Sequence, residues 1–111
     1  MMVRLFLDDE RFPSEDGWIV VRSVAAARTW VEANGFPDYV SFDNDLGDGQ
    51  PEGRHFADWL IERDLDRGGM PSAFAYYVHS QNPVARDAIN AKLGAYLRYR
   101  EAGRQAIGEG A

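Results

Sequence analysis

The sequence predicts a single α/β domain built on a mainly parallel, four-stranded sheet. Three observations predict it: short apolar runs that suit strands, longer segments with helical periodicity between them, and glycines and prolines at the junctions. After the second strand, strands and helices alternate, which is typical of a parallel sheet covered by helices. A chain of 111 residues is the right length for one such domain.

The expected strands are short and rich in apolar, β-branched and aromatic residues. The first is almost wholly apolar, as a strand buried inside a sheet would be. The segments are Val3–Leu7, Trp18–Arg22, Tyr39–Phe42 and Ala73–Val78.

The expected helices carry an apolar face and have recognisable ends. Ser23 can cap the first, which runs to about Asn34 before Gly35. The second spans His55–Arg67, and the third begins at Pro83 and runs to about Glu101. Residues 103–111 hold three glycines and few large side chains, so we expect a flexible C-terminal tail after a domain of residues 1–102.

Composition excludes several classes of protein. With no cysteine, the chain has neither disulfides nor thiolate metal sites, which favours a cytoplasmic setting. No apolar run approaches the roughly 20 residues of a membrane span. The formal net charge of −6 argues against binding along extended duplex DNA, which needs clustered lysine and arginine.

Polar clusters follow three of the four expected strands. The first strand ends at Asp8 and Asp9, the third at Asp43 and Asp45, and the fourth at His79. Ligands of parallel sheets bind outside the carboxyl ends of the strands, so these groups should meet at one edge. Four adjacent carboxylates cannot all ionise without compensation, which leaves protonation or a bound cation. Oxygen ligands without thiolate favour Mg²⁺, with Mn²⁺ or Ca²⁺ as substitutes.

Other side chains at this edge have two interpretations each. His79 suits a general acid or base, or a hydrogen-bonded structural residue. Arg11 suits an ion pair with an acid or a clamp on a phosphate. Glu10 is compatible with a role in the site and with a structural role at the surface. Asp48 precedes a glycine in a turn dipeptide and is expected to be structural.

The segments "LFLDD" and "PDYVSFD" resemble the receiver domains of two-component signalling. By that resemblance Asp8 and Asp9 match the acid pair that binds Mg²⁺, and Asp43 matches the phospho-acceptor. The backbone carbonyl of Asp45 would complete the metal site. The resemblance implies a receiver-like (flavodoxin-like) three-layer sandwich with a truncated sheet. The chain departs from the receiver pattern in two places. Receivers have a small hydroxyl residue after the fourth strand, where this chain has "HS". They also have a fifth strand that ends in a lysine, and this strand is not expected here.

The motifs "LFLDDERFP", "SFDNDLG" and "HSQNP" resemble more closely the cyclic-phosphate-processing receiver domains, over roughly residues 3–97. This resemblance implies a metal-dependent phosphoesterase acting on a cyclic nucleotide or on an RNA end with a 2′,3′-cyclic phosphate. Asp43 and His79 would be catalytic, and Asp8, Asp9, Asp43 and Asp45 would hold the metal. Phosphate oxygens would bind to Arg11, Ser80 and Asn82.

Two other functions stay open from the sequence. One is a signalling module in which Asp43 accepts a phosphoryl group. The other is a non-catalytic protein that binds a nucleotide or a protein, of a kind that a phage or a bacterium would encode. A sheet without its fifth strand also leaves a surface that a second copy would cover, so a homodimer is a further expectation.

Overall fold

The structure, a computed structural model, describes residues 2–110, with side chains described through residue 103. Its elements follow the expected order along the chain. They are β1 (Arg4–Leu7), β2 (Trp18–Val21), α1 (Val24–Asn34), β3 (Tyr39–Phe42), α2 (Gly53–Arg67), β4 (Ala75–Val78) and α3 (Pro83–Gly110).

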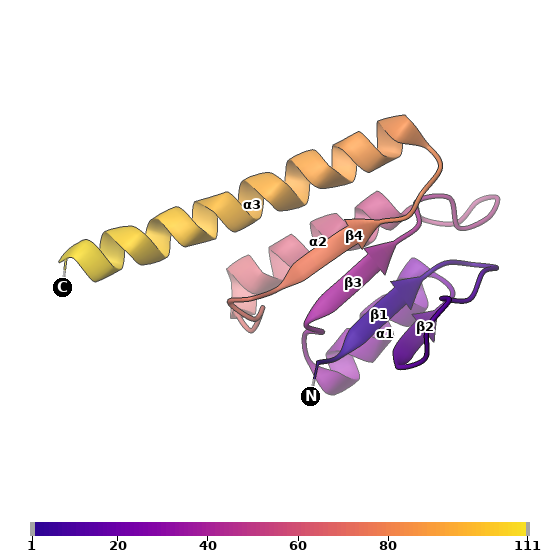
Figure 1. Ribbon diagram of the computed structural model, residues 1–111, viewed down its shortest axis with the longest axis horizontal. Helices are drawn as coiled ribbons and strands as arrows, with labels where there is room; N and C mark the ends of the chain where they lie inside the picture. The colour runs from indigo at the N-terminus through magenta and orange to yellow at the C-terminus, as the bar shows by residue number, and fades with distance from the viewer. Residues whose placement is uncertain (1, 111) are drawn as a thin grey trace.

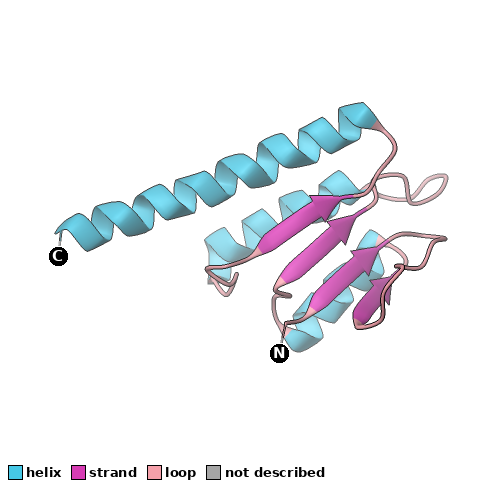
Figure 2. Cartoon of the chain, viewed as in Figure 1, coloured by secondary structure: helices cyan, strands magenta, loops and turns pink. Residues whose placement is uncertain are grey.

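The four strands form one sheet in the order β2-β1-β3-β4, and every pairing is parallel (Figures 1 and 2). Leu7 pairs with Val21 on one side and with Phe42 on the other, and Phe42 pairs with Val78. All four strands therefore end at the same level. The predicted α/β, receiver-like sheet of four strands is confirmed.

The core lies on one face of this sheet. Alternate strand residues such as Leu5, Leu7 and Phe42 are fully buried there, because side chains at a spacing of two share a face. Apolar residues of all three helices join the same cluster, among them Val31, Phe56 and Leu93. In Figure 1, α1 and α2 lie behind the sheet, and α3 runs along its β4 side, next to α2.

The fold therefore has two layers, and the expected three-layer sandwich is wrong in that respect. A third layer needs a helix on the opposite face, and within residues 2–110 no helix lies there. The connection between β1 and β2, residues 8–17, is a loop with no helix. Consequently the face that carries Arg4, Phe6, Ser41 and Tyr77 has no helical cover.

The third helix continues beyond its expected end near Glu101 and reaches Gly110. Its middle is tied to the core by Tyr96, whose hydroxyl donates to Asp64, and by Arg100, which donates to the carbonyl of Met70. Flexibility of residues 103–111 stays a prediction. Among the described residues, no helix is long and apolar enough to cross a membrane.

Candidate functional site

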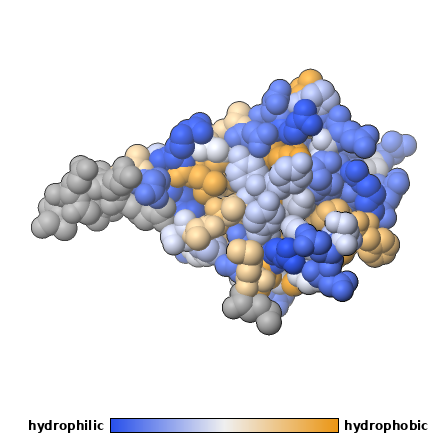
Figure 3. Space-filling view, viewed as in Figure 1, coloured by the Kyte–Doolittle hydropathy of each residue, from blue (hydrophilic) through white to orange (hydrophobic). Residues whose placement is uncertain are grey.

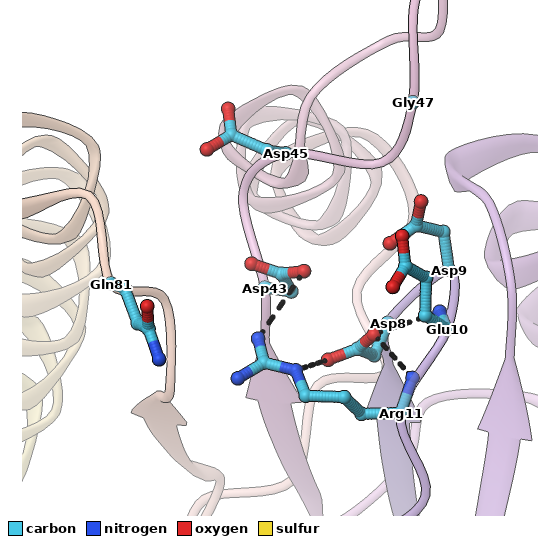
Figure 4. A pocket seen from close by; sticks show the side chains of 8 residues that line it. All are labelled: Asp8, Asp9, Glu10, Arg11, Asp43, Asp45, Gly47 and Gln81. Atoms are coloured by element: carbon cyan, nitrogen blue, oxygen red, sulfur yellow. Dashed lines mark hydrogen bonds and ion pairs between the residues drawn. The ribbon is translucent and has the colours of Figure 1, made fainter.

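An open pocket of about 380 Å³ lies at the carboxyl end of the sheet (Figure 4). Its lining is strongly acidic, with one arginine among five carboxylates. It comes from the loops after β1, β3 and β4, and consists of Asp8, Asp9, Glu10, Arg11, Asp43, Asp45, Gly47 and Gln81. The acids therefore lie together at the carboxyl ends of the strands, as the sequence predicted.

Asp8 is the most heavily bonded carboxylate of the pocket. It is 1% exposed, and its Oδ1 accepts hydrogen bonds from the backbone N–H groups of Glu10 and Arg11 at 2.9 and 2.8 Å. Its Oδ2 accepts from Arg11 Nε at 2.8 Å and lies 3.0 Å from His79 Nε2. The loop after β1 is thus folded around this one side chain.

Asp43 faces Asp8 from the end of β3 and is also buried. Its Oδ1 accepts from the backbone N–H of Asn44 at 2.8 Å, and its Oδ2 lies 3.5 Å from an Nη atom of Arg11. The guanidinium of Arg11 therefore bridges the two aspartates (Figure 4). In this state it supplies the positive charge that two neighbouring carboxylates need.

The two carboxylates differ in their acidity. Burial, the largest influence on Asp8, acts to raise its pKa, but the N–H donors of Arg11 and Glu10, His79 and the charge of Arg11 together lower it. Burial raises the pKa of Asp43, and the negative charge of Asp8 raises it further. Neighbouring carboxyls whose pKa values move apart are common at functional sites.

The position of Asp43 depends on close packing against the start of α2. Gly53 donates its N–H to the carbonyl of Asn44 at 2.9 Å, and a Cβ on Gly53 would collide with the backbone carbonyl of Asp43. The side chain of Asn44 is buried and donates to Glu52 at 3.1 Å. Gly53 therefore lets the helix approach the loop that carries the acid.

His79 lies on the uncovered face of the sheet and contacts Asp8 of the pocket from there. Its ring lies flat on Phe6, with centroids 4.5 Å apart and planes at 6°. Ser41 Oγ lies 2.7 Å from Nδ1. Since an ionised carboxylate only accepts, Nε2 of His79 donates to Asp8. When the ring is neutral, Nδ1 accepts from the hydroxyl of Ser41.

Asp8, Asp43 and His79 form a group that could hold a metal, because each offers a ligand atom and these atoms lie within 4.8 Å of one another. Asp9 and Asp45 line the same pocket, but they are outside this group. Figure 4 shows the carboxylate of Asp45 pointing away from the bridge made by Arg11.

Ser80 and Asn82, expected at the phosphate, have structural contacts here. Ser80 Oγ accepts from the N–H of Asn82, and Asn82 Oδ1 accepts from the N–H of Ala85 in the first turn of α3. The residue between them, Gln81, lines the pocket instead. Ser41 and Gly53 were not predicted as site residues. The one sequence signal for Ser41 is its place two residues before Asp43, which puts both on one face of the strand.

None of the curated proteins matches this chain. A solved structure that covers 95% of this chain and 85% of its own is a fusion of yeast Spc42 trimeric coiled-coil amino acids 181–211 to another structure, with 17% identity and a TM-score of 0.49. Residues 3–95 match the cyclic-phosphate processing receiver domain family, and they include every acid of the pocket. The chain belongs to that family.

Proposed function

We propose that this protein is a metal-dependent phosphoesterase that opens a cyclic phosphate on a nucleotide or at an RNA end. One observation carries the proposal: Asp8, Asp43 and His79, from three different strands, bring their ligand atoms within 4.8 Å of one another at the edge of the sheet. Membership of a family named for cyclic-phosphate processing supports the substrate class.

The pocket suits a hard divalent cation, and Mg²⁺ is the ion we propose, with Mn²⁺ as a substitute. Its donors are carboxylate oxygens, with no thiolate. A phosphate entering a pocket with five acids and one arginine would be repelled, so its binding needs added positive charge. Asp8 and Asp43 would hold the ion, with Asp9 and the Asp45 carbonyl completing the set.

Such an ion would polarise a phosphoryl oxygen and lower the pKa of a bound water. Arg11 is well placed to bind a phosphate oxygen once it leaves Asp43, because its side chain is 46% exposed and its contact to Asp43 is long, at 3.5 Å. Ser80 and Asn82 would contact phosphate only by exchanging their present bonds in the turn before α3.

The reaction adds water across one phosphorus–oxygen bond of the ring. The water oxygen bonds to phosphorus, one ring oxygen leaves, and that oxygen takes up a proton, so the product is a phosphomonoester. We propose His79 as the group that transfers the proton, since its Nε2 is close to both acids. Attack by Asp43 itself is the alternative route, through an aspartyl-phosphate that water then hydrolyses.

The signalling alternative is less well supported. A phospho-accepting receiver has a lysine near its acceptor aspartate, and Lys92, the only lysine of this chain, pairs with Asp58 at 2.8 Å on the surface between α2 and α3. Incubation with acetyl phosphate tests this reading, because a stable adduct on Asp43 would favour signalling over turnover.

The test of the phosphoesterase is the hydrolysis of 2′,3′-cyclic and 3′,5′-cyclic nucleotides and of RNA with a terminal cyclic phosphate, followed by phosphorus NMR. We expect turnover with Mg²⁺ and none with a chelator. Asp43→Asn should abolish Mg²⁺ binding and turnover together, whereas His79→Ala should lower the rate roughly 100- to 10,000-fold. Failure to hydrolyse any cyclic phosphate, by protein that binds Mg²⁺, would overturn the proposal.

A further inference from the structure

The uncovered face of the sheet carries aromatic side chains next to the pocket. The strand registers place its residues in three rows that run across the strands, each row about 7 Å from the next. The first row, at the pocket, holds Asp8, Asp43 and His79. The two rows behind it consist of Val20, Phe6, Ser41 and Tyr77, and then of Trp18, Arg4, Tyr39 and Ala75.

We propose that this face binds the bases of a single-stranded RNA end whose terminal cyclic phosphate enters the pocket. The inference rests on the proposed function and names its substrate: a nucleic acid strand with stacked bases, rather than a small cyclic phosphate alone. Base stacking on aromatic side chains of an open sheet is a general means of binding single strands.

The accessible ring nearest the chemistry is Tyr77. It is 60% exposed, and it precedes His79 by two residues, so both side chains lie on the same face. Its neighbour Tyr76 points the other way and donates to the carbonyl of Asn90 in α3. A base on Tyr77 would therefore lie one row behind the phosphate in the pocket.

The row behind extends this surface. Trp18 and Tyr39 are partly exposed and meet edge to face, with ring centroids 5.8 Å apart. Phe6 connects them to the pocket, because it contacts Trp18 at 5.8 Å and stacks on His79 at 4.5 Å. The aromatic surface is thus continuous with the site, which is a reason to assign both to one ligand.

The charges on this face also favour a nucleic acid strand. The guanidinium of Arg4 lies 4.5 Å from the ring centre of Trp18 and donates to the backbone carbonyl of Asp16. Arg22 stacks on Phe12 and donates to the carbonyls of Asp8 and Arg11. Within the described residues neither arginine pairs with a carboxylate, so both positive charges are available to phosphates.

Figure 3 shows this face: its centre has weakly polar colours, and both strongly hydrophilic and hydrophobic side chains border it. Here Val20 is the only large aliphatic residue among the eight positions of the two rear rows.

The experiment measures binding of a short RNA that ends in a 3′-phosphate and carries the fluorescent base 2-aminopurine at that end. Stacking should quench the fluorescence. We expect Tyr77→Ala to weaken binding on the order of 10-fold and Tyr77→Phe to retain it. Tyr99→Ala, at another exposed tyrosine (67% exposed, on α3), is the matched control and should change nothing. Tyr77→Leu, which keeps bulk without a ring, should behave like the alanine variant.

Two results would overturn the inference. One is unchanged RNA affinity in folded Tyr77→Ala and Tyr77→Leu. The other is that the protein forms a dimer, and that Tyr77→Ala and Tyr77→Leu dissociate this dimer while RNA binding persists. This result would make the face an interface between copies of the chain. The failure of the proposed function is distinguishable: it would leave Tyr77-dependent RNA binding intact without turnover. If turnover occurs, the ratio of kcat/KM for RNA to kcat/KM for ethylene phosphate, a cyclic phosphate without a base, should fall about 10-fold in Tyr77→Ala.

Discussion

The Oδ2 atom of Asp8 lies 3.0 Å from Nε2 of His79, although 71 residues separate them along the chain. Their strands, β1 and β4, are not neighbours, because β3 lies between them. The contact crosses β3 above Ser41, whose Oγ meets the other ring nitrogen of His79. Three strands are therefore tied together at the edge where the candidate chemistry occurs.

Replacing Asp8 by asparagine should destabilise the metal-free protein by about 1–3 kcal/mol. The buried carboxylate accepts from two backbone N–H groups, from Arg11 and from His79, and an amide loses the charge that strengthens these bonds. Urea unfolding at neutral pH measures the change. A variant as stable as the wild type would show that these bonds contribute little.

Replacing Asp43 by asparagine should have the opposite sign and raise the stability slightly. Burial and the charge of Asp8 both disfavour its ionised form, and asparagine can keep the bond from the N–H of Asn44. Comparison of the two variants in the same unfolding experiment, without metal, is the check. Equal losses from both would contradict the different acidities of the pair.

The metal-free protein should also show two opposing pH effects. Asp8 has a lowered pKa, so its contribution to stability is present above the unfolded value of 3.8 and is lost as the pH falls through the folded value. Asp43 has a raised pKa, so stability falls as the pH rises from 3.8 through its folded value. When the free energy of unfolding is measured against pH, the wild type should lose stability as the pH rises above 3.8, and Asp43→Asn should not show this loss.

The residues at the strand ends were the most informative part of the sequence. In parallel sheets, ligands bind outside the carboxyl ends of the strands. This rule predicted that Asp8, Asp43 and His79 lie close together, and they do, because all four strands end at one level. The present contacts of Ser80 and Asn82 did not follow from that rule, since a side chain beside a turn competes for the N–H groups of that turn. Their binding to phosphate stays a prediction. Ser41 was not predicted, because the only signal for a serine inside this apolar strand is its spacing of two from Asp43.

Two features of the fold were not predicted correctly from the sequence: the number of layers and the end of the last helix. Alternation of strands and helices does not say which face each helix covers, so the sequence predicted a third layer that no helix within residues 2–110 forms. The three glycines of residues 103–111 predicted that the last helix ends near Glu101, but each glycine disfavours a helix by only about 1 kcal/mol. Contacts distant in sequence, such as that of Arg100 with the carbonyl of Met70, hold α3 beside the core.

Gly53→Ala should destabilise the protein by about 1–3 kcal/mol and weaken Mg²⁺ binding. The new Cβ would collide with the backbone carbonyl of Asp43, so the start of α2 and the loop that holds the acid must separate. Thermal unfolding and calorimetric titration with Mg²⁺ measure the two effects. Gly103→Ala, where a Cβ meets nothing within 4 Å, is the control and should be neutral or slightly stabilising.

Ser41→Ala should lower the rate of cyclic-phosphate hydrolysis about 5- to 10-fold while Mg²⁺ affinity stays unchanged. Ser41 touches His79 and neither carboxylate of the pair, so its loss frees the ring to turn and removes the donor that holds its tautomer. The reduction should fall on kcat rather than on KM, because substrate contacts are untouched. Steady-state kinetics beside a Mg²⁺ titration separates the cases: an equal loss of metal affinity would mean that Ser41 supports the whole edge of the sheet rather than positioning His79.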